Sequence, residues 1–367
     1  MCSIIRDALC AARAAMRTVA LRATAGVGIL VVSVALAACG STSSSSSASA
    51  GASSSGSANG AAASAARPLA GKTVAIVSVA NSNPWAAVYN AAIKSYVGSR
   101  GATVHLLASS DPATQVQLLN SAVAEHPSLI FLEALDSKAM APAIAKAKAA
   151  GVTIVNTDGP ADPAVASGLH QVLSDNYQLG QFAAENLIQG LAQEHKTAAK
   201  IGVITGTAAM LVTQDRMKGF YNVLDKHPRY KVVATEDGNW DPVLSGQEAT
   251  QLFSKFGHSG LQAMYGMADY QAVPIVTAAK QAGIPLGTKQ DGLVITGSNC
   301  FKVGINAIKA GEMFGTATED PGTISLQAAE YGTALLEGKK VPLVETVQEH
   351  QVTPSTLAQY EAQCSKA

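Results

Sequence analysis

The sequence predicts an α/β fold with two lobes, each built on an open, doubly wound parallel sheet. Short β-branched apolar runs alternate with longer segments in which Ala, Ile, Leu and Val recur at spacings of three and four. Repeated strand–helix units of this kind form parallel sheets with helices on both faces. Two groups of four strands, separated by the polar stretch around Asp175 and Asn176, indicate the two lobes.

The predicted elements follow this alternation along the chain. The strands of the first group are expected at 73–79, 103–107, 128–132 and 152–156, and those of the second at 200–204, 230–234, 263–266 and 293–296. Helical spacing is found in the segments 84–97, 113–124, 137–149, 179–193 and 270–282.

The composition restricts the class of protein. The 367 residues include 26 basic and 26 acidic side chains, a balance that excludes binding of nucleic acid through a basic surface. Aromatic residues make up only 5% of the chain, so the core is expected to consist mostly of Ala, Val, Leu and Ile. The length suits about two domains of ordinary size.

The N-terminal segment has the features of an export signal. Residues 1–22 carry four arginines and one acid, and residues 23–38 carry no charge, which is the pattern of a signal peptide. This apolar run is shorter than the roughly 20 residues that span a membrane, so we expect cleavage. The sequence Leu-Ala-Ala-Cys-Gly at 36–40 resembles the bacterial lipobox, in which the cysteine is acylated and becomes the new N-terminus.

Residues 1–38 are therefore expected to be a lipoprotein signal peptide and Cys39 the site of lipidation. The segment 39–71 that follows is rich in Ser, Ala and Gly, a composition that cannot offset its chain entropy by burial. It is expected to tether the lipid to the folded part. The alternative is a short N-terminal helix with a buried Cys39.

Two further cysteines, Cys300 and Cys364, lie in the folded part. Outside the cytoplasm, such a pair suggests a disulfide. The alternative is two separate buried thiols. Neither has a histidine beside it in the sequence, so neither is interpreted as a nucleophile.

Polar or aromatic residues follow several of the predicted strands. Asn83 and Trp85 follow the first strand, Asp158 the fourth, Asp269 the seventh and Asn299 the eighth. In open parallel sheets, ligands bind outside the carboxyl ends of the strands. Helix capping alone would explain any one of these residues, but the whole collection favours a ligand site.

Five motifs in this order resemble the type I periplasmic binding proteins for sugars, the ribose-binding-like group that also supplies the effector lobes of LacI-type repressors. They are Asn83-Pro84-Trp85, Thr157-Asp158, Ser174-Asp175-Asn176, Arg216-Met217-Lys218-Gly219-Phe220 and Asn239-Trp240-Asp241. The similarity runs from about residue 72 to residue 357.

The resemblance implies two lobes joined by three crossover strands, which close on a small ligand. The crossings are expected near Ser174, Glu319 and Val347. The N-terminal lobe would then comprise 72–174 plus 320–347, and the C-terminal lobe 175–319 plus 348–367. Both Cys300 and Cys364 would lie in the C-terminal lobe, so their disulfide would leave the hinge free.

The resemblance also implies a set of ligand-binding residues. Asn83 and Trp85 would hydrogen-bond and stack on a sugar from the first lobe, and Trp240 would cover the opposite face of the ring. Asp158 would accept hydrogen bonds from hydroxyl groups, and Arg216 would donate to the ring oxygen or to neighbouring hydroxyls. The alternative role of either tryptophan is core packing, and that of Arg216 is a surface ion pair.

Asp269, Asn299 and Glu319 complete the expected ligand set, with departures from the family pattern. Asn299 stands where the family has an aspartate, and Glu319 replaces a hinge glutamine. Gly159 replaces an arginine that often follows the first-lobe aspartate, and Ala268 replaces an asparagine before Asp269. These changes speak against ribose itself and leave other pentoses, hexoses and linear polyols open.

The sequence therefore predicts a monomeric, extracytoplasmic solute-binding lipoprotein, anchored to the outer face of the cell membrane by its lipid. It would capture a monosaccharide or polyol and deliver it to the permease of an ABC transporter, with no cofactor, metal or nucleic acid. The alternative is a sensory receptor subunit that presents its bound small molecule to a membrane chemoreceptor or kinase. Sequence alone does not separate these two roles.

An enzyme and a transcriptional repressor are the other functions to consider. No hydrolase, metalloprotease, Walker or dinucleotide-binding motif occurs in the mature chain, and the seven histidines have no metal-ligand spacing. A repressor would need a helix-turn-helix where this chain has a signal and a tether. We therefore expect a protein without catalytic activity.

Overall fold

The computed structural model describes residues 67–287 and 292–364 of the chain. The predicted signal peptide, Cys39 and most of the predicted tether lie outside these residues. All described residues belong to one of the two units into which the chain divides, Ser55–Ala367. No helix of the described ranges is both long enough and apolar enough to cross a membrane.

The first sheet contains six parallel strands in the order β11-β5-β4-β3-β1-β2. Their bounds are β1 Thr73–Val79, β2 Thr103–Ser109, β3 Leu129–Leu132, β4 Ile154–Asp158, β5 His170–Ser174 and β11 Val344–Val347. Successive side chains of a strand point to opposite faces. In β1, Val74 and Ile76 therefore join one hydrophobic cluster, and Ala75 and Val77 join another.

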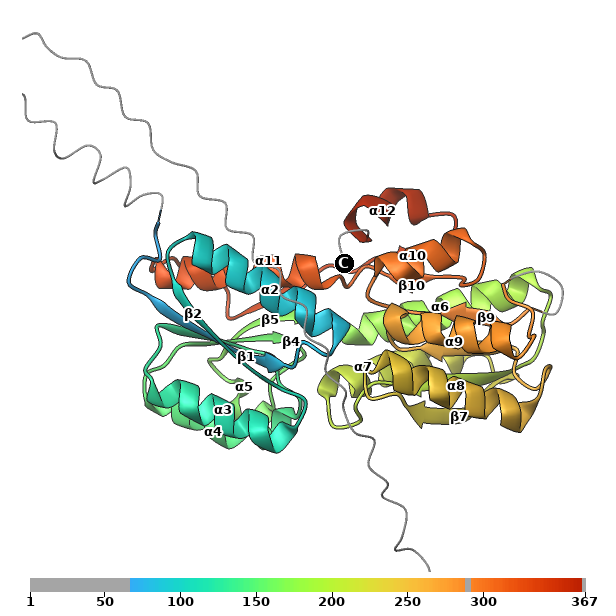
Figure 1. Cartoon of the computed structure of the whole chain (residues 1–367), viewed down its shortest axis with the longest axis horizontal. Coiled ribbons are helices and arrows are strands. Elements are labelled where there is room, and N and C mark those ends of the chain that lie inside the picture. The colour runs from blue at the N-terminus through green and yellow to red at the C-terminus, as the bar shows by residue number, and fades with distance from the viewer. Residues whose placement is uncertain (1–66, 288–291, 365–367) are drawn as a thin grey trace, which may run out of the picture. The chain divides into compact units, whose positions relative to one another are not determined.

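Helices cover both faces of this sheet. On one face lie α2 (Pro84–Ser99) and α11 (Pro321–Leu336), and on the other lie α3 (Pro112–Ala124), α4 (Ser137–Ala149) and the short α5 (Pro163–Ala166) (Figure 1). Prolines at the first turn and aspartate or asparagine caps begin α2, α3 and α11, as expected where a helix starts directly after a strand.

The second sheet contains four parallel strands in the order β7-β6-β8-β9. Their bounds are β6 Ala199–Thr205, β7 Tyr230–Asp237, β8 Ala263–Gly266 and β9 Val294–Thr296. One face packs on α6 (Asn176–Gln193) and α7 (Leu211–Leu224), and the other on α8 (Pro242–Phe256) and α9 (Asp269–Gln281). The predicted α/β class with doubly wound parallel sheets is thus confirmed.

The remaining elements lie beside the second sheet. Helices α10 (Lys302–Lys309) and α12 (Leu357–Cys364) contact each other, and β10 (Thr316–Ala317) pairs with β12 (Gln351–Val352) in an antiparallel ribbon. A disulfide between Cys300 and Cys364 joins the loop before α10 to the end of α12, with a Cα–Cα distance of 4.8 Å. Both cysteine side chains are fully buried.

The first sheet differs from the prediction of four strands, because β5 and β11 were missed. The sequence of β5, HQVLS, begins and ends with polar residues, and that of β11, VETV, lies at the sheet edge with only one buried residue. Neither is the continuous apolar run that marks a strand buried on both faces. The eight predicted strands all occur, with ends that differ by no more than three residues.

The chain passes between the two sheets at three places. It leaves β5 at Ser174 and enters α6, it returns between β10 and α11, and it leaves β11 at Val347 for β12. These links position the residues that follow each strand close to residues from the other sheet. The exact lobe boundaries stay a prediction.

Candidate ligand-binding site

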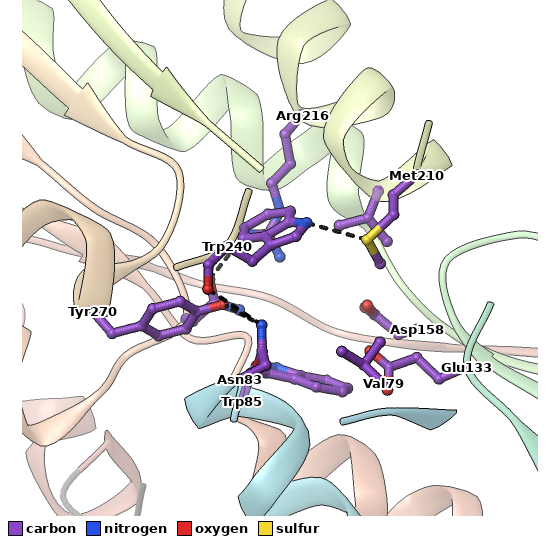
Figure 2. A pocket seen from close by; sticks show the side chains of 11 residues that line it. Val79, Asn83, Trp85, Glu133, Asp158, Met210, Arg216, Trp240 and Tyr270 are labelled. Carbon is purple, nitrogen blue, oxygen red and sulfur yellow. Dashed lines mark hydrogen bonds between the residues drawn. The ribbon is translucent and has the colours of Figure 1, made fainter. Parts of the chain in front are cut away.

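A cavity with about 330 Å³ of empty space, part of it open to solvent, is lined by residues from strand ends of both sheets, the loops that follow them and the helices that come next (Figure 2). Six of the eight predicted ligand residues line it: Asn83, Trp85, Asp158, Arg216, Trp240 and Asn299. Its other lining residues are Val79, Glu133, Met210, Val212 and Tyr270. The carboxyl ends of parallel strands thus converge on one small cavity, as the strand-end rule predicts.

The start of α2 places Asn83 and Trp85 at the cavity. The side-chain oxygen of Asn83 caps the helix by accepting from Ala86 N at 2.9 Å, which leaves its amide nitrogen to face the cavity, 3.5 Å from the backbone oxygen of Trp240. In the first turn of the helix, the Trp85 ring stacks on Tyr89, with 4.9 Å between ring centroids and a 17° angle between the planes. Capping and ligand binding are therefore compatible roles for Asn83.

Trp240 enters the cavity from the loop between β7 and α8. The backbone at Asn239 and Trp240 has φ angles of 48° and 55°, a left-handed conformation that is uncommon for residues with a side chain. Its indole Nε1 lies 3.1 Å from Sδ of Met210, and Gly206 packs so closely on the ring that a Cβ there would overlap it. Figure 2 shows the Trp85 and Trp240 rings on opposite sides of the cavity.

Left-handed backbone is concentrated around this cavity. Seven non-glycine residues of the described ranges have a positive φ angle, and five of them lie in three strand-end loops: Asp158, Asn239, Trp240, Asn299 and Cys300. Such conformations cost free energy and persist where the surrounding structure fixes them, often at ligand sites. The strain therefore supports a functional role for these loops.

Arg216 is buried, with 1% of its surface exposed. Its guanidinium donates to the side chains of Asn176 and Asn299, to the backbone oxygen of Met267, and to Glu319, with which it forms an ion pair at 3.2 Å. Burial opposes the charged form, but the carboxylates of Glu319 and Asp158 outweigh it and keep the pKa of Arg216 raised. The surface ion pair considered from the sequence is therefore wrong.

Close helix packing holds Arg216 in this position. Gly180 on α6 lies against the backbone carbonyl of Arg216, and Gly219 on α7 lies against the backbone carbonyl of Tyr177. A Cβ at either glycine would overlap these backbone atoms. The two helices can therefore approach near enough for Asn176 to bond Arg216 at 2.8 Å.

Two carboxyl groups line the cavity from neighbouring strands of the first sheet. Glu133 follows β3 and Asp158 ends β4, and each has 5% of its surface exposed. Ser78 Oγ donates to Glu133 at 2.6 Å, and Asn176 approaches Asp158 at 3.4 Å. Burial, reinforced by the charge of Asp158, raises the pKa of Glu133 to about 8, and burial also raises the pKa of Asp158 despite the nearby Arg216.

Glu319 and Asp269 are predicted ligand residues that do not line the cavity. Glu319 lies behind its wall, where it accepts from Trp85, Ser174, Arg216 and Asn299. Burial and the charge of Asp158 raise its pKa well above the usual range. Its contacts support the wall residues rather than a ligand.

Asp269 is fully buried and serves the neighbouring loop. Its Oδ2 accepts from Phe301 N at 2.8 Å, and it packs against Gly297 and Gly304. Burial raises its pKa to about 8. The next residue, Tyr270, lines the cavity, whereas Asp269 does not.

The other lining residues were missed by sequence reasoning. Glu133 directly follows a predicted strand, so the rule that indicated Asp158 would also have found it. Met210 and Val212 are apolar residues at the start of α7, and no feature of the sequence separates them from core residues. Within the described ranges, no group of three or more His, Cys, Asp or Glu side chains is placed to hold a metal ion.

Residues 74–340 match the family described as the periplasmic binding protein domain. The chain belongs to this family. The expected family resemblance is thus confirmed, and membership of a family of binding proteins agrees with the expectation that the chain is not an enzyme.

Named relatives of this binding protein include a ribose import binding protein of Bacillus subtilis, 26% identical over 260 residues, which are 71% of this chain and 80% of the relative. A D-apiose import binding protein of Actinobacillus succinogenes is 28% identical over 168 residues, or 46% of this chain and 53% of the relative. A xylitol-binding protein of Mycolicibacterium smegmatis is 24% identical over 235 residues, or 64% of this chain and 63% of the relative. The matched segment thus spans about half to four fifths of these relatives.

Solved structures show the same fold as this binding protein. A Caulobacter myo-inositol binding protein superposes with a TM-score of 0.71 at 19% identity and covers 78% of this chain and 95% of that one. An Actinobacillus succinogenes solute-binding protein with bound D-allose gives a TM-score of 0.69 at 20% identity, covering 79% and 100%. The similarity at these identities concerns the fold.

Proposed function

We propose that the chain is an extracytoplasmic solute-binding lipoprotein that captures a monosaccharide or polyol in this cavity and delivers it to an ABC importer. The observation that carries the proposal is the position of the two tryptophans, the only two in the chain, which both line the cavity. Aromatic faces suit the C–H faces of a sugar or a folded polyol, and the carboxyl, amide and guanidinium groups around them suit its hydroxyls.

The relatives and the solved structures favour a ligand of monosaccharide size. The names of the relatives include ribose, apiose and xylitol, and bound myo-inositol and allose appear in the solved structures. These ligands are pentoses, a hexose and polyols, and they define the range to be tested.

Closure around the ligand is the proposed mechanism. The cavity is lined by residues of both sheets, and the Asn83 amide already reaches the backbone oxygen of Trp240 and the Tyr270 hydroxyl, each at 3.5 Å. A ligand that contacts both sides would favour the closed form over the open one. The closed form would then be the one that the permease recognises.

The binding test uses the full chain and thermal melting against aldoses, ketoses, alditols and nucleosides. A ligand at about 100 times its Kd adds roughly 2.7 kcal/mol to the stability of the folded state. Trp85→Ala and Trp240→Ala should each remove the shift, whereas Tyr221→Ala, at an exposed aromatic on α7, should keep it. Retained affinity in both tryptophan variants would contradict the assignment.

The proposed localisation and transport role need separate tests. Cys39→Ala should release the protein from the membrane fraction, with Cys10→Ala as the control outside the lipobox. Deletion of the chain should abolish uptake of the ligand found by melting. If uptake were unchanged but the cell's chemoreceptor or kinase no longer responded to the same ligand, the sensory role would be favoured instead.

A further inference from the structure

We propose that the ligand carries a positively charged group, such as a protonated amine, which lies between Glu133 and Asp158 while its hydroxylated body lies between the two indole rings. This inference rests on the proposed function, because it names the ligand class of the same cavity. It follows from an imbalance of charge among the lining residues.

The two carboxyl groups share one end of the cavity. The strands β3 and β4 are adjacent, with Leu132 paired to Asn156, so Glu133 and Asp158 emerge at the same sheet edge. Figure 2 shows them together, away from Tyr270. Each is nine-tenths or more buried.

Arg216 acts on Asp158 through its charge, but its ion pair is with another acid. Arg216 is the only cationic side chain among the lining residues that the structure describes, and four of its hydrogen bonds already go to Asn176, Met267, Asn299 and Glu319. A guanidinium has five N–H donors, and its ion pair is with Glu319 rather than with Glu133. Gly159, the residue after Asp158, has no side chain, and a Cβ there would come within 2.8 Å of Val212 Cγ2.

The carboxyl groups keep acceptor capacity that the protein does not use. An ionised carboxylate can accept about four hydrogen bonds. Glu133 accepts from Ser78 and from the backbone of Val79, and Asp158 accepts from Ser174 and, at 3.4 Å, from Asn176. An ammonium group brings three donors and a positive charge. The nearby Trp85 ring would add a cation–π attraction.

Burial of an ionised carboxylate without a cation beside it is unfavourable, so Glu133 stays protonated when no cationic ligand is bound. This agrees with the raised pKa of Glu133, about 8. A cationic ligand would displace that proton, so its affinity should rise with pH until the amine itself deprotonates. The titratable and charged groups that face Glu133 are Tyr89 on α2, Asp158 on β4, Arg216 on α7 and Tyr270 on α9.

The test is calorimetric titration of the full chain with matched ligand pairs at pH 6 and pH 8. Each pair is an alditol and its 1-amino-1-deoxy derivative, or a sugar and its amino sugar. We expect the best amine to bind about tenfold or more tightly than its neutral partner, as for a charge-assisted hydrogen bond. Between pH 6 and pH 8, its affinity should rise by up to about tenfold per unit, because one proton is released.

Variants then locate the effect. Glu133→Gln should lower the affinity for the amine at least tenfold and remove most of the preference for amine over neutral ligand. Glu349→Gln is the matched control, because Glu349 is also buried, has a pKa of about 8 and does not line the cavity. Asp158→Asn gives a second variant with the same expectation if Glu133→Gln does not fold.

The outcomes separate this inference from the proposed function. Neutral sugars or polyols that bind as tightly as their amines would overturn the cationic ligand and leave the proposed function intact. Binding of no member of any pair would overturn both.

Discussion

Trp85 and Glu319 are separated by 234 positions, yet the indole nitrogen of Trp85 donates to Oε1 of Glu319 at 3.0 Å. The other oxygen of this carboxylate accepts from Arg216 and Asn299. One buried acid therefore connects α2 of the first sheet with α7 and the β9 loop of the second. The lining residues on the two sides of the cavity are therefore connected to one another through Glu319, in addition to being held by their own loops.

This network predicts a large difference between two neighbouring cations on α7. Arg216→Met leaves Glu319 buried without its partner, and breaking a buried pair of this kind costs about 3–5 kcal/mol of unfolding free energy. Lys218→Met removes only an exposed pair with Asp215, which is worth about 0–1 kcal/mol. Urea unfolding at pH 7 measures both, and equal losses would show that the network does not stabilise the fold.

The ligand-free chain should lose stability as pH rises from about 5.5 to 8.5. Burial raises the pKa of Glu133, Asp269 and Glu349 to about 8 each, whereas unfolded carboxyls titrate near 4. The folded state therefore binds more protons in this range, and its advantage disappears as pH passes through the folded pKa values. Urea unfolding at several pH values tests this, and Glu349→Gln should make the slope shallower. A stability that increases with pH would contradict it.

The glycine contacts between α6 and α7 should not tolerate a methyl group. Gly180→Ala would place a Cβ on the backbone of Arg216, and overpacking of this kind costs about 1–3 kcal/mol. Because α7 would have to move, ligand affinity should fall as well. Gly98→Ala on α2 is the control, since its nearest neighbour would be Val104 Cγ2 at 3.9 Å, and its melting temperature should not fall. A Gly180→Ala protein with unchanged affinity would show that Arg216 does not depend on this contact.

The disulfide should stabilise the folded chain. Cys300 and Cys364 are separated by 64 positions, and closing such a loop contributes roughly 4 kcal/mol in the chain-entropy model. The double variant Cys300→Ala, Cys364→Ala should therefore melt at a lower temperature than the parent chain. A reductant should lower the melting temperature of the parent chain and leave that of the double variant unchanged. Mass spectrometry of a non-reduced digest should find the two cysteines in one linked peptide. Two free thiols in that digest would contradict the pairing.

Much of the fold could be predicted because its strands are apolar runs flanked by polar loops. The missed strands β5 and β11 lack this signal, since one has polar ends and the other lies at an exposed edge. The rule that ligand residues follow strand ends indicated Asp158 and Asn299, which line the cavity. The same rule does not distinguish a cavity residue from its neighbour, which is why Asp269 was chosen and Tyr270 was not.

The apolar residues that line the cavity at the start of α7 were beyond sequence reasoning. Met210 and Val212 look like core residues in the sequence, because only the three-dimensional placement of α7 turns them toward the cavity. The role of Glu319 was equally hidden. Its four bonding partners lie between 20 and 234 positions away, so no local pattern could reveal that it supports the walls.

The position of the tryptophans gives the protein a built-in optical reporter. The chain has two, and both rings line the cavity, one hydrogen-bonded to a carboxylate and the other beside a methionine sulfur. All tryptophan emission therefore comes from the ligand site. Ligand binding should therefore change the wavelength maximum and the intensity of the intrinsic fluorescence. A variant that keeps only Trp85 or only Trp240 would report on one side of the cavity.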